Sequence, residues 1–331
     1  MDPVITVAVP VFDERGTLEE LHQRVTEVLR AVGEPYEILF VDDGSRDGSK
    51  TTLDAIAERD PAVGVVHFRR NFGKSAALHV AFERARGEVI ITMDADLQDD
   101  PSEIPRLLSA LEDHELDLVS GWKQKRQDPL GKTLPSKLFN YVVRRLTGLH
   151  LNDFNCGFKA YRREAVEELE LYGELHRYIP VLVDGMGFRC GEVPVKHHAR
   201  KWGHSKYGVE RMAKGFFDLL TVILLTRYRR RPLHLFGWGG LVSFSFGFLC
   251  LAYLTVMKTV FDQAIAGRPL FFLGVLLVLL GTQLISTGLL GEMINGSRTT
   301  RPGYHIAREL PVREVSVPSS EPAVKEARAS A

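Results

Sequence analysis

This sequence contains little cysteine and has no excess of either charge. Its 331 residues include three cysteines, Cys156, Cys190 and Cys250, whose spacing fits neither a metal motif nor a disulfide pattern. Such scarcity is typical of the reducing cytosol. Lysine plus arginine number 42, as do aspartate plus glutamate, so no global charge indicates a nucleic-acid partner. We also expect no signal peptide, because a strand-like run follows Pro3 directly.

Two familiar phosphate-binding motifs are absent as well. No Gly-x-Gly-x-x-Gly follows the first strand-like run, which argues against a Rossmann dinucleotide site. Gly73-Lys74-Ser75 resembles the end of a P-loop, but Phe68 stands where that motif requires glycine. Without a glycine-rich loop, a nucleoside diphosphate would need a metal ion to hold it.

The first two-thirds of the chain alternates strand-like and helix-like segments, a pattern typical of an α/β fold with a largely parallel sheet. Strands are predicted over residues 4–9, 36–41, 63–68, 89–91 and 117–121, and helices over 18–32, around 53–57, over 74–84 and after Pro101. Thr17 and Glu20 have the spacing of a capping box. Ligands of such sheets bind outside the carboxyl ends of the strands. We therefore expect the turns 10–14, 42–45 and 94–98 to share one crevice.

The acidic turn at residues 94–100 follows a short apolar run that is typical of a strand buried on both faces. If the extended geometry persists, Asp94 and Asp96 project the same way. Two such carboxylates repel each other unless a cation lies between them, and Mg²⁺ or Mn²⁺ favours carboxylates together with substrate phosphates. The alternative is a solvated acidic turn that only begins the helix after Pro101.

Two nearly uncharged runs, Leu233 to Val256 and Pro269 to Met293, match the length needed to cross a membrane. A buried core hairpin is the alternative. Basic residues cluster at 227–231 before the first run and at 298–308 after the second, so both chain ends are expected in the cytosol. Glu292 is expected to snorkel or to pair at the interface. The predicted divisions are a cytosolic domain over 1–210, a juxtamembrane amphipathic helix and basic flank over 211–232, the spans over 233–294, and a disordered tail over 295–331.

Segments at about 135–148 and 209–226 are apolar on one side and lie close to the spans in the sequence. They are either core helices or helices lying on the bilayer surface. The basic, glycine-containing stretch 200–207 indicates an anion-binding loop. Its alternative role is that of a basic flank that fixes membrane topology.

Four motifs occur in order: Pro10-Val11-Phe12-Asp13-Glu14, Val41-Asp42-Asp43-Gly44-Ser45, Asp94-Ala95-Asp96-Leu97-Gln98 and Arg200-Lys201-Trp202-Gly203-His204-Ser205-Lys206-Tyr207. Together they resemble the family 2 glycosyltransferases and, with the two spans, the dolichol-phosphate mannose synthase-like group that glycosylates polyprenyl phosphates. The resemblance covers residues 4–294. It implies a GT-A-type, Rossmann-like, mostly parallel sheet domain, followed by interfacial helices and a two-helix transmembrane hairpin.

The same resemblance assigns roles to individual residues. Pro10, Val11, Glu14 and Asp43 match positions that bind the base and ribose, and Asp94 would help to seat the nucleotide and metal. Asp96 and Gln98 would ligate Mg²⁺ or Mn²⁺, while Lys123, Arg126, Arg200, Ser205 and Lys206 would bind the acceptor phosphate. Asp153 matches the acidic residue of inverting members and is, with Asp96, a predicted catalytic residue. Lys74 is a weaker candidate with a more structural role.

The implied activity is metal-dependent, inverting transfer of one sugar from a UDP- or GDP-sugar to undecaprenyl or dolichyl phosphate, for cell-envelope glycans. A lipid phosphate, with a second pKa of about 6, is already ionised, so Asp153 is expected to orient a substrate rather than remove a proton. A chain-extruding synthase is disfavoured, because His198-Ala199-Arg200-Lys201-Trp202 is not a Gln-x-x-Arg-Trp motif.

Two other functions stay open: transfer to another membrane lipid, whose hydroxyl would need a true base, and a non-catalytic nucleotide-sugar-binding protein. The sequence leaves undetermined the sugar, the nucleotide, the polyprenol length, the pathway and any homo-oligomer.

Overall fold

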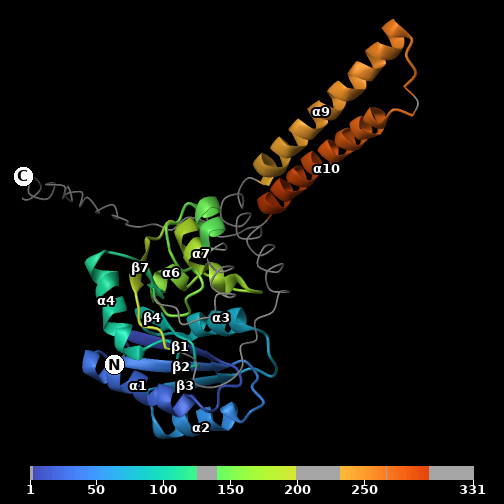
Figure 1. The fold of residues 1–331 in the computed structure, drawn as a ribbon. Helices are drawn as coiled ribbons and strands as arrows, with labels where there is room; N and C mark the ends of the chain where they lie inside the picture. Colours follow the sequence, from blue (N-terminus) through green and yellow to red (C-terminus); the bar gives the residue numbers. More distant parts are fainter. Residues whose placement is uncertain (1–2, 125–139, 199–231, 266, 298–331) are drawn as a thin grey trace, which may run out of the picture.

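The computed structural model describes residues 3–124, 140–198, 232–265 and 267–297. Within them, the first part of the chain forms a mixed sheet with helices on both faces, and the last part forms two long helices (Figure 1).

The sheet has seven strands in the order β3-β2-β1-β4-β6-β5-β7. Their bounds are Ile5–Val11 (β1), Tyr36–Asp42 (β2), Val63–His67 (β3), Val89–Thr92 (β4), Leu118–Trp122 (β5), Lys159–Arg162 (β6) and Cys190–Pro194 (β7). All pairings are parallel except those of β6, which runs antiparallel to both β4 and β5. The prediction of a mostly parallel sheet is confirmed. Strands β6 and β7 were not predicted, and β6 separates β4 from β5.

The helices bury two apolar clusters, one on each face of this sheet. Their bounds are Leu18–Val32 (α1), Ser49–Arg59 (α2), Lys74–Arg84 (α3), Pro101–Glu103 (η1), Ile104–Asp113 (α4), Arg163–Val166 (α6), Leu175–Tyr178 (η2) and Ile179–Gly185 (α7). Side chains alternate along β1, so Val7 and Val9 belong to the cluster that contains residues of α1, α2 and α4, while Ala8 belongs to the cluster that contains residues of α3 and α7. Both faces of the sheet are thus covered, and a ligand site is expected outside the carboxyl ends of the strands.

The predicted capping box at the start of α1 is wrong. Thr17 precedes the helix, but its hydroxyl makes no capping hydrogen bond to the helix backbone. Its Oγ1 instead lies 2.6 Å from the carbonyl oxygen of Ala95 and 2.8 Å from that of Glu14. Glu20 pairs with Arg24 one turn on. The buried hydroxyl of Thr17 thus joins the turn after β1 to the acidic turn after β4, a tertiary contact that competes with the local cap.

The two apolar runs form α9 (Pro232–Phe261) and α10 (Pro269–Ser297), which lie side by side as a hairpin (Figure 1). Glycines allow the two backbones to approach closely, since a Cβ at Gly240 would lie 2.8 Å from the carbonyl oxygen of Gly281. Only 17% and 11% of the most apolar stretches of the two helices are buried, with mean hydropathies of 1.9 and 2.1. A buried core hairpin is therefore ruled out, and such extensive exposed apolar surface is that of a membrane protein.

Glu292 lies near the end of α10, and its Oε2 is 3.5 Å from the backbone nitrogen of Leu233 at the start of α9. This contact gives the Glu292 carboxylate a partner in α9, and the prediction that Glu292 snorkels or pairs at the membrane interface stays a prediction.

Part of one predicted interfacial segment is described, and residues 140–147 are helical. Val143 is buried in the domain core, whereas Tyr141 is 63% exposed. This piece therefore has both a core face and an exposed face. Residues 135–139 and the whole second segment at 209–226 lie outside the described residues.

Candidate active site

The candidate site lies where β1, β2 and β4 end side by side. Val11 at the end of β1 is opposite Asp42 at the end of β2, and the backbone N–H of Asp43 donates to the carbonyl of Val11 at 2.8 Å. On the other side, the N–H of Met93 donates to the carbonyl of Ala8 at 3.2 Å. Sheet topology therefore brings together the three polar turns that the sequence predicts to share one crevice.

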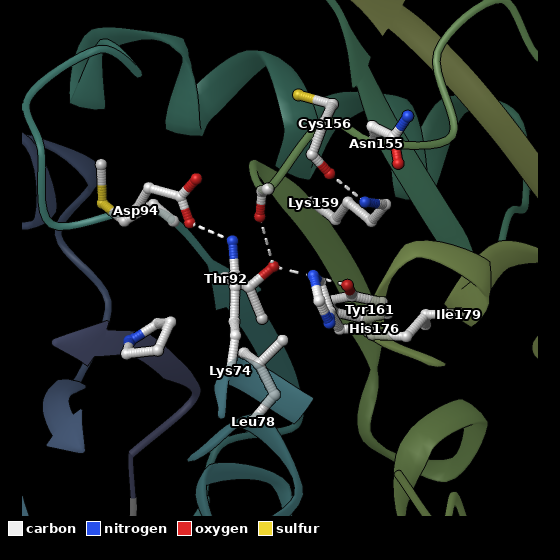
Figure 2. Close-up of a pocket in the computed structure, with 13 residues that line it drawn as sticks. Lys74, Leu78, Thr92, Asp94, Asn155, Cys156, Lys159, Tyr161, His176 and Ile179 are labelled. Carbon is white, nitrogen blue, oxygen red and sulfur yellow. Dashed lines mark hydrogen bonds and ion pairs between the residues drawn. The ribbon is translucent and has the colours of Figure 1, made fainter. Parts of the chain in front are cut away.

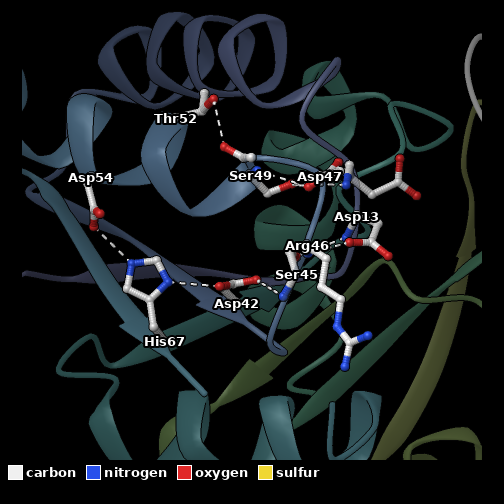
Figure 3. Close-up of polar contacts among 11 residues, drawn as sticks. Asp13, Asp42, Ser45, Arg46, Asp47, Ser49, Thr52, Asp54 and His67 are labelled. Atoms are coloured by element: carbon white, nitrogen blue, oxygen red, sulfur yellow. Dashed lines mark hydrogen bonds and ion pairs between the residues drawn. The ribbon is translucent and has the colours of Figure 1, made fainter. Parts of the chain in front are cut away.

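Hydrogen bonds fasten the first two turns to each other (Figure 3). The N–H of Asp13 donates to Oγ of Ser45 at 2.9 Å, and the N–H of Arg46 donates to Oδ1 of Asp13 at 2.8 Å. Asp13 has a φ of 54°, in the left-handed region that aspartate tolerates better than most residues. The N–H of Glu14 donates to Oγ of Ser49 at 3.2 Å. These contacts give the segment with Pro10 and Glu14 a fixed position beside Asp43.

His67 stabilises the turn at residues 42–45 through contacts with two aspartates (Figure 3). Its Nδ1 lies 2.9 Å from Oδ2 of Asp42, and its Nε2 lies 2.9 Å from Oδ1 of Asp54. The other oxygen of the buried Asp42 carboxylate accepts a hydrogen bond from the N–H of Ser45 at 3.0 Å. Asp42 is therefore a structural residue, and the neighbouring Asp43 faces a different set of partners.

Asp43 is buried and accepts hydrogen bonds from the backbone N–H groups of Phe72 at 2.6 Å and Gly73 at 2.9 Å. Burial raises the pKa of Asp43, although those two donors oppose the shift. Gly44 is required here, because a Cβ at this position would lie 2.5 Å from the backbone of Arg70. Asp43 thus joins the turn after β2 to the segment that begins α3.

The side chain of Val11 is 1% exposed and belongs to the core. Of its groups, only the backbone lies at this edge of the sheet. Its predicted part in nucleotide binding is therefore limited to main-chain contacts. The roles of Pro10, Glu14 and Asp43 stay predictions.

The acidic turn departs from the extended geometry on which the metal argument depended. Strand β4 ends at Thr92, and a turn follows in which Leu97 has a φ of 59°. Asp96 is buried, and its Oδ1 accepts a hydrogen bond from the N–H of Gln98 at 3.1 Å. Asp94 is half-buried and forms an ion pair with Lys74. The expectation that the two carboxylates project together along a strand is therefore wrong, although both stay in one short turn.

Asp94, Asp96 and Gln98 offer oxygen ligands that suit a hard divalent cation. Among the described residues, no cluster of three or more His, Cys, Asp or Glu side chains could hold a metal unaided. This donor set fits an ion that completes its coordination with substrate phosphates, and it does not fit a closed, all-protein metal cage.

Lys74 lies closer to the acidic turn than its sequence context indicated. It begins α3, and its ammonium group contacts the Asp94 carboxylate (Figure 2). Burial lowers the pKa of Lys74, but the charge and hydrogen bond of Asp94 outweigh this effect and the net pKa is raised. Gly157 packs closely against the same carboxylate, since a Cβ at this position would lie 2.7 Å from Oδ1 of Asp94. Asp94 is thus held from two sides.

Beneath Asp94 lies a small polar pocket between α3, β4, β6 and η2 (Figure 2). It is lined by Pro10, Lys74, Leu78, Thr92, Met93, Asp94, Asn155, Cys156, Gly157, Lys159, Tyr161, His176 and Ile179. Among these, Pro10 and Asp94 were predicted site residues, and Lys74 was a weaker candidate. Sequence reasoning missed Lys159 and His176. The usable signal was a lysine within the otherwise uncharged run from Phe154 to Tyr161.

Asp153 is buried, with 1% of its surface exposed. Its Oδ1 accepts a hydrogen bond from the N–H of Asn155 at 3.1 Å, and its backbone carbonyl lies 3.4 Å from the hydroxyl of Ser120. Asn155 lines the pocket but Asp153 does not. Its predicted catalytic role stays a prediction, and its carboxylate also shapes the loop that forms the pocket rim.

Lys123 occupies a buried charge cluster. Its Nζ lies 2.9 Å from Oδ1 of Asp99, and Nδ1 of His197 lies 3.9 Å from the same oxygen. Burial disfavours the Asp99 carboxylate, but Lys123 and His197 outweigh that effect and hold its pKa well below the usual range. The pKa of Lys123 is raised correspondingly. Its predicted contact with an acceptor phosphate is untested, and in this structure its partner is Asp99.

The other predicted acceptor-binding residues, Arg126, Arg200, Ser205 and Lys206, lie outside the described residues. The described chain reaches the neighbourhood of that loop at His198, whose N–H donates to the carbonyl of Gln98 at 2.8 Å. Its Nε2 lies 3.0 Å from Oδ2 of Asp100. The chain entering the basic loop is thereby fastened to the acidic turn.

Comparison with known proteins agrees with this geometry. The family model described as glycosyl transferase family 2 matches residues 6–170. Dodecaprenyl-phosphate galacturonate synthase of Rhizobium johnstonii is 40% identical over 301 residues, which are 88% of this chain and 89% of the relative. Undecaprenyl-phosphate 4-deoxy-4-formamido-L-arabinose transferase of Pseudomonas paraeruginosa is 38% identical over 322 residues, 96% of this chain and 93% of the relative.

Among solved structures, glucosyl-3-phosphoglycerate synthase from Mycobacterium tuberculosis, crystallised with Mn²⁺, UDP and phosphoglyceric acid, has a TM-score of 0.52 at 18% identity. The match covers 68% of this chain and 78% of that one. It confirms the predicted GT-A type of the sheet domain. The sequence relatives confirm the predicted family, and this chain belongs to glycosyl transferase family 2.

Proposed function

We propose that this glycosyltransferase moves one sugar from a nucleotide-sugar donor to a polyprenyl phosphate at the cytoplasmic face of a membrane. One observation carries the proposal: relatives named for polyprenyl-phosphate sugar transfer match this chain over both the sheet domain and the apolar hairpin. A long polyprenyl tail stays in the bilayer, so its phosphate must meet a site attached to the membrane. The paired helices α9 and α10 supply that attachment.

The nucleotide would bind at the ends of β1 and β2. Asp43 and Glu14 would contact its base and ribose, because hydrogen bonds within the turns hold both residues at this end of the sheet. The diphosphate would then lie beside the acidic turn after β4. The ammonium group of Lys74, which contacts Asp94 in this structure, would contact an oxygen of the diphosphate instead.

Asp94, Asp96 and Gln98 would hold Mg²⁺ or Mn²⁺ together with the diphosphate. When bound, the ion supplies Lewis-acid stabilisation of the negative charge that grows on the leaving nucleoside diphosphate.

An ionised phosphate oxygen of the lipid would attack the anomeric carbon as the bond from that carbon to the diphosphate breaks. Direct attack inverts the anomeric configuration, and the nucleoside diphosphate leaves with the bonding electron pair. The acceptor oxygen is already ionised, so Asp153 has no proton to remove. We infer that Asp153 orients the acceptor or the sugar through the loop 153–157, whose backbone its carboxylate binds.

Positive residues flank both apolar helices in the sequence, which supports a cytosolic site and cytosolic chain ends. Anionic lipid headgroups of that leaflet attract such segments. The predicted divisions at 1–210, 211–232, 233–294 and 295–331 follow from the same topology and belong to this proposal.

The proposal is tested with membranes that contain the full chain, incubated with labelled UDP- and GDP-sugars and undecaprenyl phosphate, with and without EDTA. We expect butanol-extractable label that disappears with the chelator and in an Asp96→Asn variant. Asp113→Asn, which changes an exposed acid at the end of α4, is the matched control and should keep full activity. Label on diacylglycerol but not on polyprenyl phosphate, or no transfer from any donor, would contradict the proposal.

A further inference from the structure

Lys159 is a buried cation that forms no ion pair with a carboxylate of the described residues. Its side chain lies in β6, opposite Thr92 of β4, and the residue is 2% exposed. Its ammonium group donates to the carbonyl of Cys156, and none of the described carboxylates forms an ion pair with it. Burial lowers the pKa of Lys159, although the charges of Asp153 and Asp94 oppose this shift without forming an ion pair with it. A buried charge without an ion-pair partner lowers stability, so the position of Lys159 indicates a ligand that compensates the charge.

The surroundings of Lys159 identify where that ligand would enter. The pocket beneath Asp94 is lined by the ammonium groups of Lys74 and Lys159, and Asp94 is its only carboxylate (Figure 2). Asn155 is exposed at the rim and connects the pocket to solvent. The opposite wall is neutral and polar, because the hydroxyl of Tyr161 lies 3.4 Å from that of Thr92. The site therefore has a surplus of positive charge and of hydrogen-bond donors.

His176 completes the wall on the η2 side. Its Nδ1 lies 3.0 Å from Oγ of Ser75, and its backbone N–H donates to the same oxygen at 3.1 Å. These contacts fix the ring at the pocket, next to the start of α3. Three basic side chains from three separate elements thus converge below one acidic residue of the donor site.

We propose that this pocket receives the carboxylate of the donor's sugar, so that the substrate is a nucleotide-activated hexuronate. The inference rests on the proposed function, because Asp94 marks where the donor lies. The diphosphate is assigned to the acidic turn, and among the described residues none of those predicted to bind the acceptor phosphate lines the pocket. We therefore assign the anion that enters the pocket to the sugar. The pocket is small enough to admit a substituent rather than a ring. Lys159 is then the specificity-determining residue, since a carboxylate compensates its charge and a neutral hydroxymethyl group does not.

The two relatives named above offer a direct contrast. One is named for galacturonate, whose sugar carries a carboxylate, and the other for a formamido-arabinose, whose substituent is neutral. Both substituents can accept a hydrogen bond. The excess of cations over carboxylates in the pocket favours the charged substituent.

Donor pairs that differ only at this substituent test the inference on the unmodified full chain in detergent or membranes. The pairs are UDP-galacturonate and UDP-galactose, UDP-glucuronate and UDP-glucose, and GDP-mannuronate and GDP-mannose, with UDP-4-deoxy-4-formamido-L-arabinose as a further donor. We expect kcat/KM to favour one uronate over its neutral partner by about 100-fold or more, and direct binding measured by calorimetry to follow the same order. Equal or better use of a neutral donor would overturn the inference. Absence of transfer from every donor would instead overturn the proposed function.

Lys159→Met then separates a ligand-binding role from a structural one. We expect kcat/KM for the uronate to fall by about 100-fold with little change for the matching neutral donor, and the melting temperature to rise because an uncompensated buried charge is removed. Lys50→Met, at an exposed lysine of α2, is the control and should change neither quantity. A lower melting temperature with equal losses for both donors would assign Lys159 to the fold alone.

Discussion

The ammonium group of Lys123 lies 2.9 Å from Oδ1 of Asp99, and the side chain of Asp99 is 0% exposed. Asp99 belongs to the acidic turn, whereas Lys123 directly follows β5, so this pair joins two segments that both border the candidate site. His197, on the segment after β7, contacts the same carboxylate. A single buried charge cluster therefore sets the relative positions of the acidic turn and two strand ends.

Removing one member of this pair should be far more harmful than removing both. We expect Asp99→Leu to lower the free energy of unfolding by about 3–5 kcal/mol, because Lys123 is left buried and unpaired. The double variant Asp99→Leu with Lys123→Met should recover much of that loss. Thermal unfolding of the full chain in detergent measures both. Arg24→Met breaks the exposed pair with Glu20 and should change the free energy of unfolding by at most about 1 kcal/mol. Additive losses in the double variant would show that the two residues are not coupled.

Asp96→Asn should remove most of the activity. Loss of a metal-ligating carboxylate weakens stabilisation of the leaving diphosphate, and we expect kcat/KM to fall by about 100-fold or more. The fold should survive, because asparagine can still accept the hydrogen bond that Asp96 takes from Gln98. Initial rates over a titration with Mn²⁺ and Mg²⁺ provide the measurement. An unchanged rate at low metal concentration would refute a metal role for Asp96.

The raised pKa of Asp43 predicts that nucleotide binding depends on pH. Burial raises its pKa, so the folded protein takes up a proton there at a higher pH than the unfolded chain does. The contribution of this group to stability therefore grows as the pH falls, while the carboxylate available to the nucleotide is lost. We expect the affinity of the wild type for UDP or GDP to decrease as the pH is lowered from 7 and Asp43 takes up a proton.

In Asp43→Asn, the affinity for the nucleotide should be low at every pH and should depend less on pH. Comparing this variant with the wild type removes the effect of the nucleotide's own phosphates, which titrate equally in both experiments. Calorimetric titrations measure both proteins. Asp47→Asn is the control: burial opposes ionisation of Asp47, but hydrogen bonds from Ser49 and Arg15 outweigh it and lower its pKa, so wild-type behaviour should be retained. Identical pH profiles for wild type and Asp43→Asn would exclude Asp43 as the titrating group.

Asp153→Asn distinguishes orientation from proton removal. If Asp153 orients a substrate through the loop 153–157, kcat should fall by less than about 100-fold and donor affinity should stay unchanged, since a general base contributes about 10²- to 10⁴-fold. Steady-state kinetics with polyprenyl phosphate provide the test. Complete loss of turnover with intact donor binding would instead make Asp153 the base, and would favour an acceptor that carries a hydroxyl group.

Two adjacent glycines of α9 provide a matched pair of substitutions that tests how the two helices of the hairpin pack. A Cβ at Gly240 would lie 2.7 Å from Ile285 and 2.8 Å from the carbonyl of Gly281, whereas at Gly239 the nearest atom, on Leu284, is 4.0 Å away. We expect Gly240→Val to separate the helices and lower the melting temperature by several degrees, at about 2–4 °C per kcal/mol lost. Gly239→Val, on the exposed side, should leave it nearly unchanged. Equal effects of the two substitutions would mean that the helices do not pack in this register.

The sequence by itself determined the alternating α/β order, the helix over 74–84 and the two apolar spans, because each depends on local periodicity or on length. It also indicated the turns that carry Asp43, Asp94 and Asp96, since polar residues directly follow apolar runs. These features are properties of short stretches, and burial of their apolar faces follows wherever a sheet forms.

Only the tertiary structure decided how the segments meet. No local pattern requires β6 to enter between β4 and β5, yet that insertion brings Lys159 and Gly157 into the lining of the pocket beneath Asp94. Thr17 looks like a helix cap in sequence but binds the distant Ala95, and Lys123 looks like a free basic residue but is paired with Asp99. Such contacts depend on which strand ends are neighbours, and strand order is set by long-range packing rather than by the sequence of any one segment.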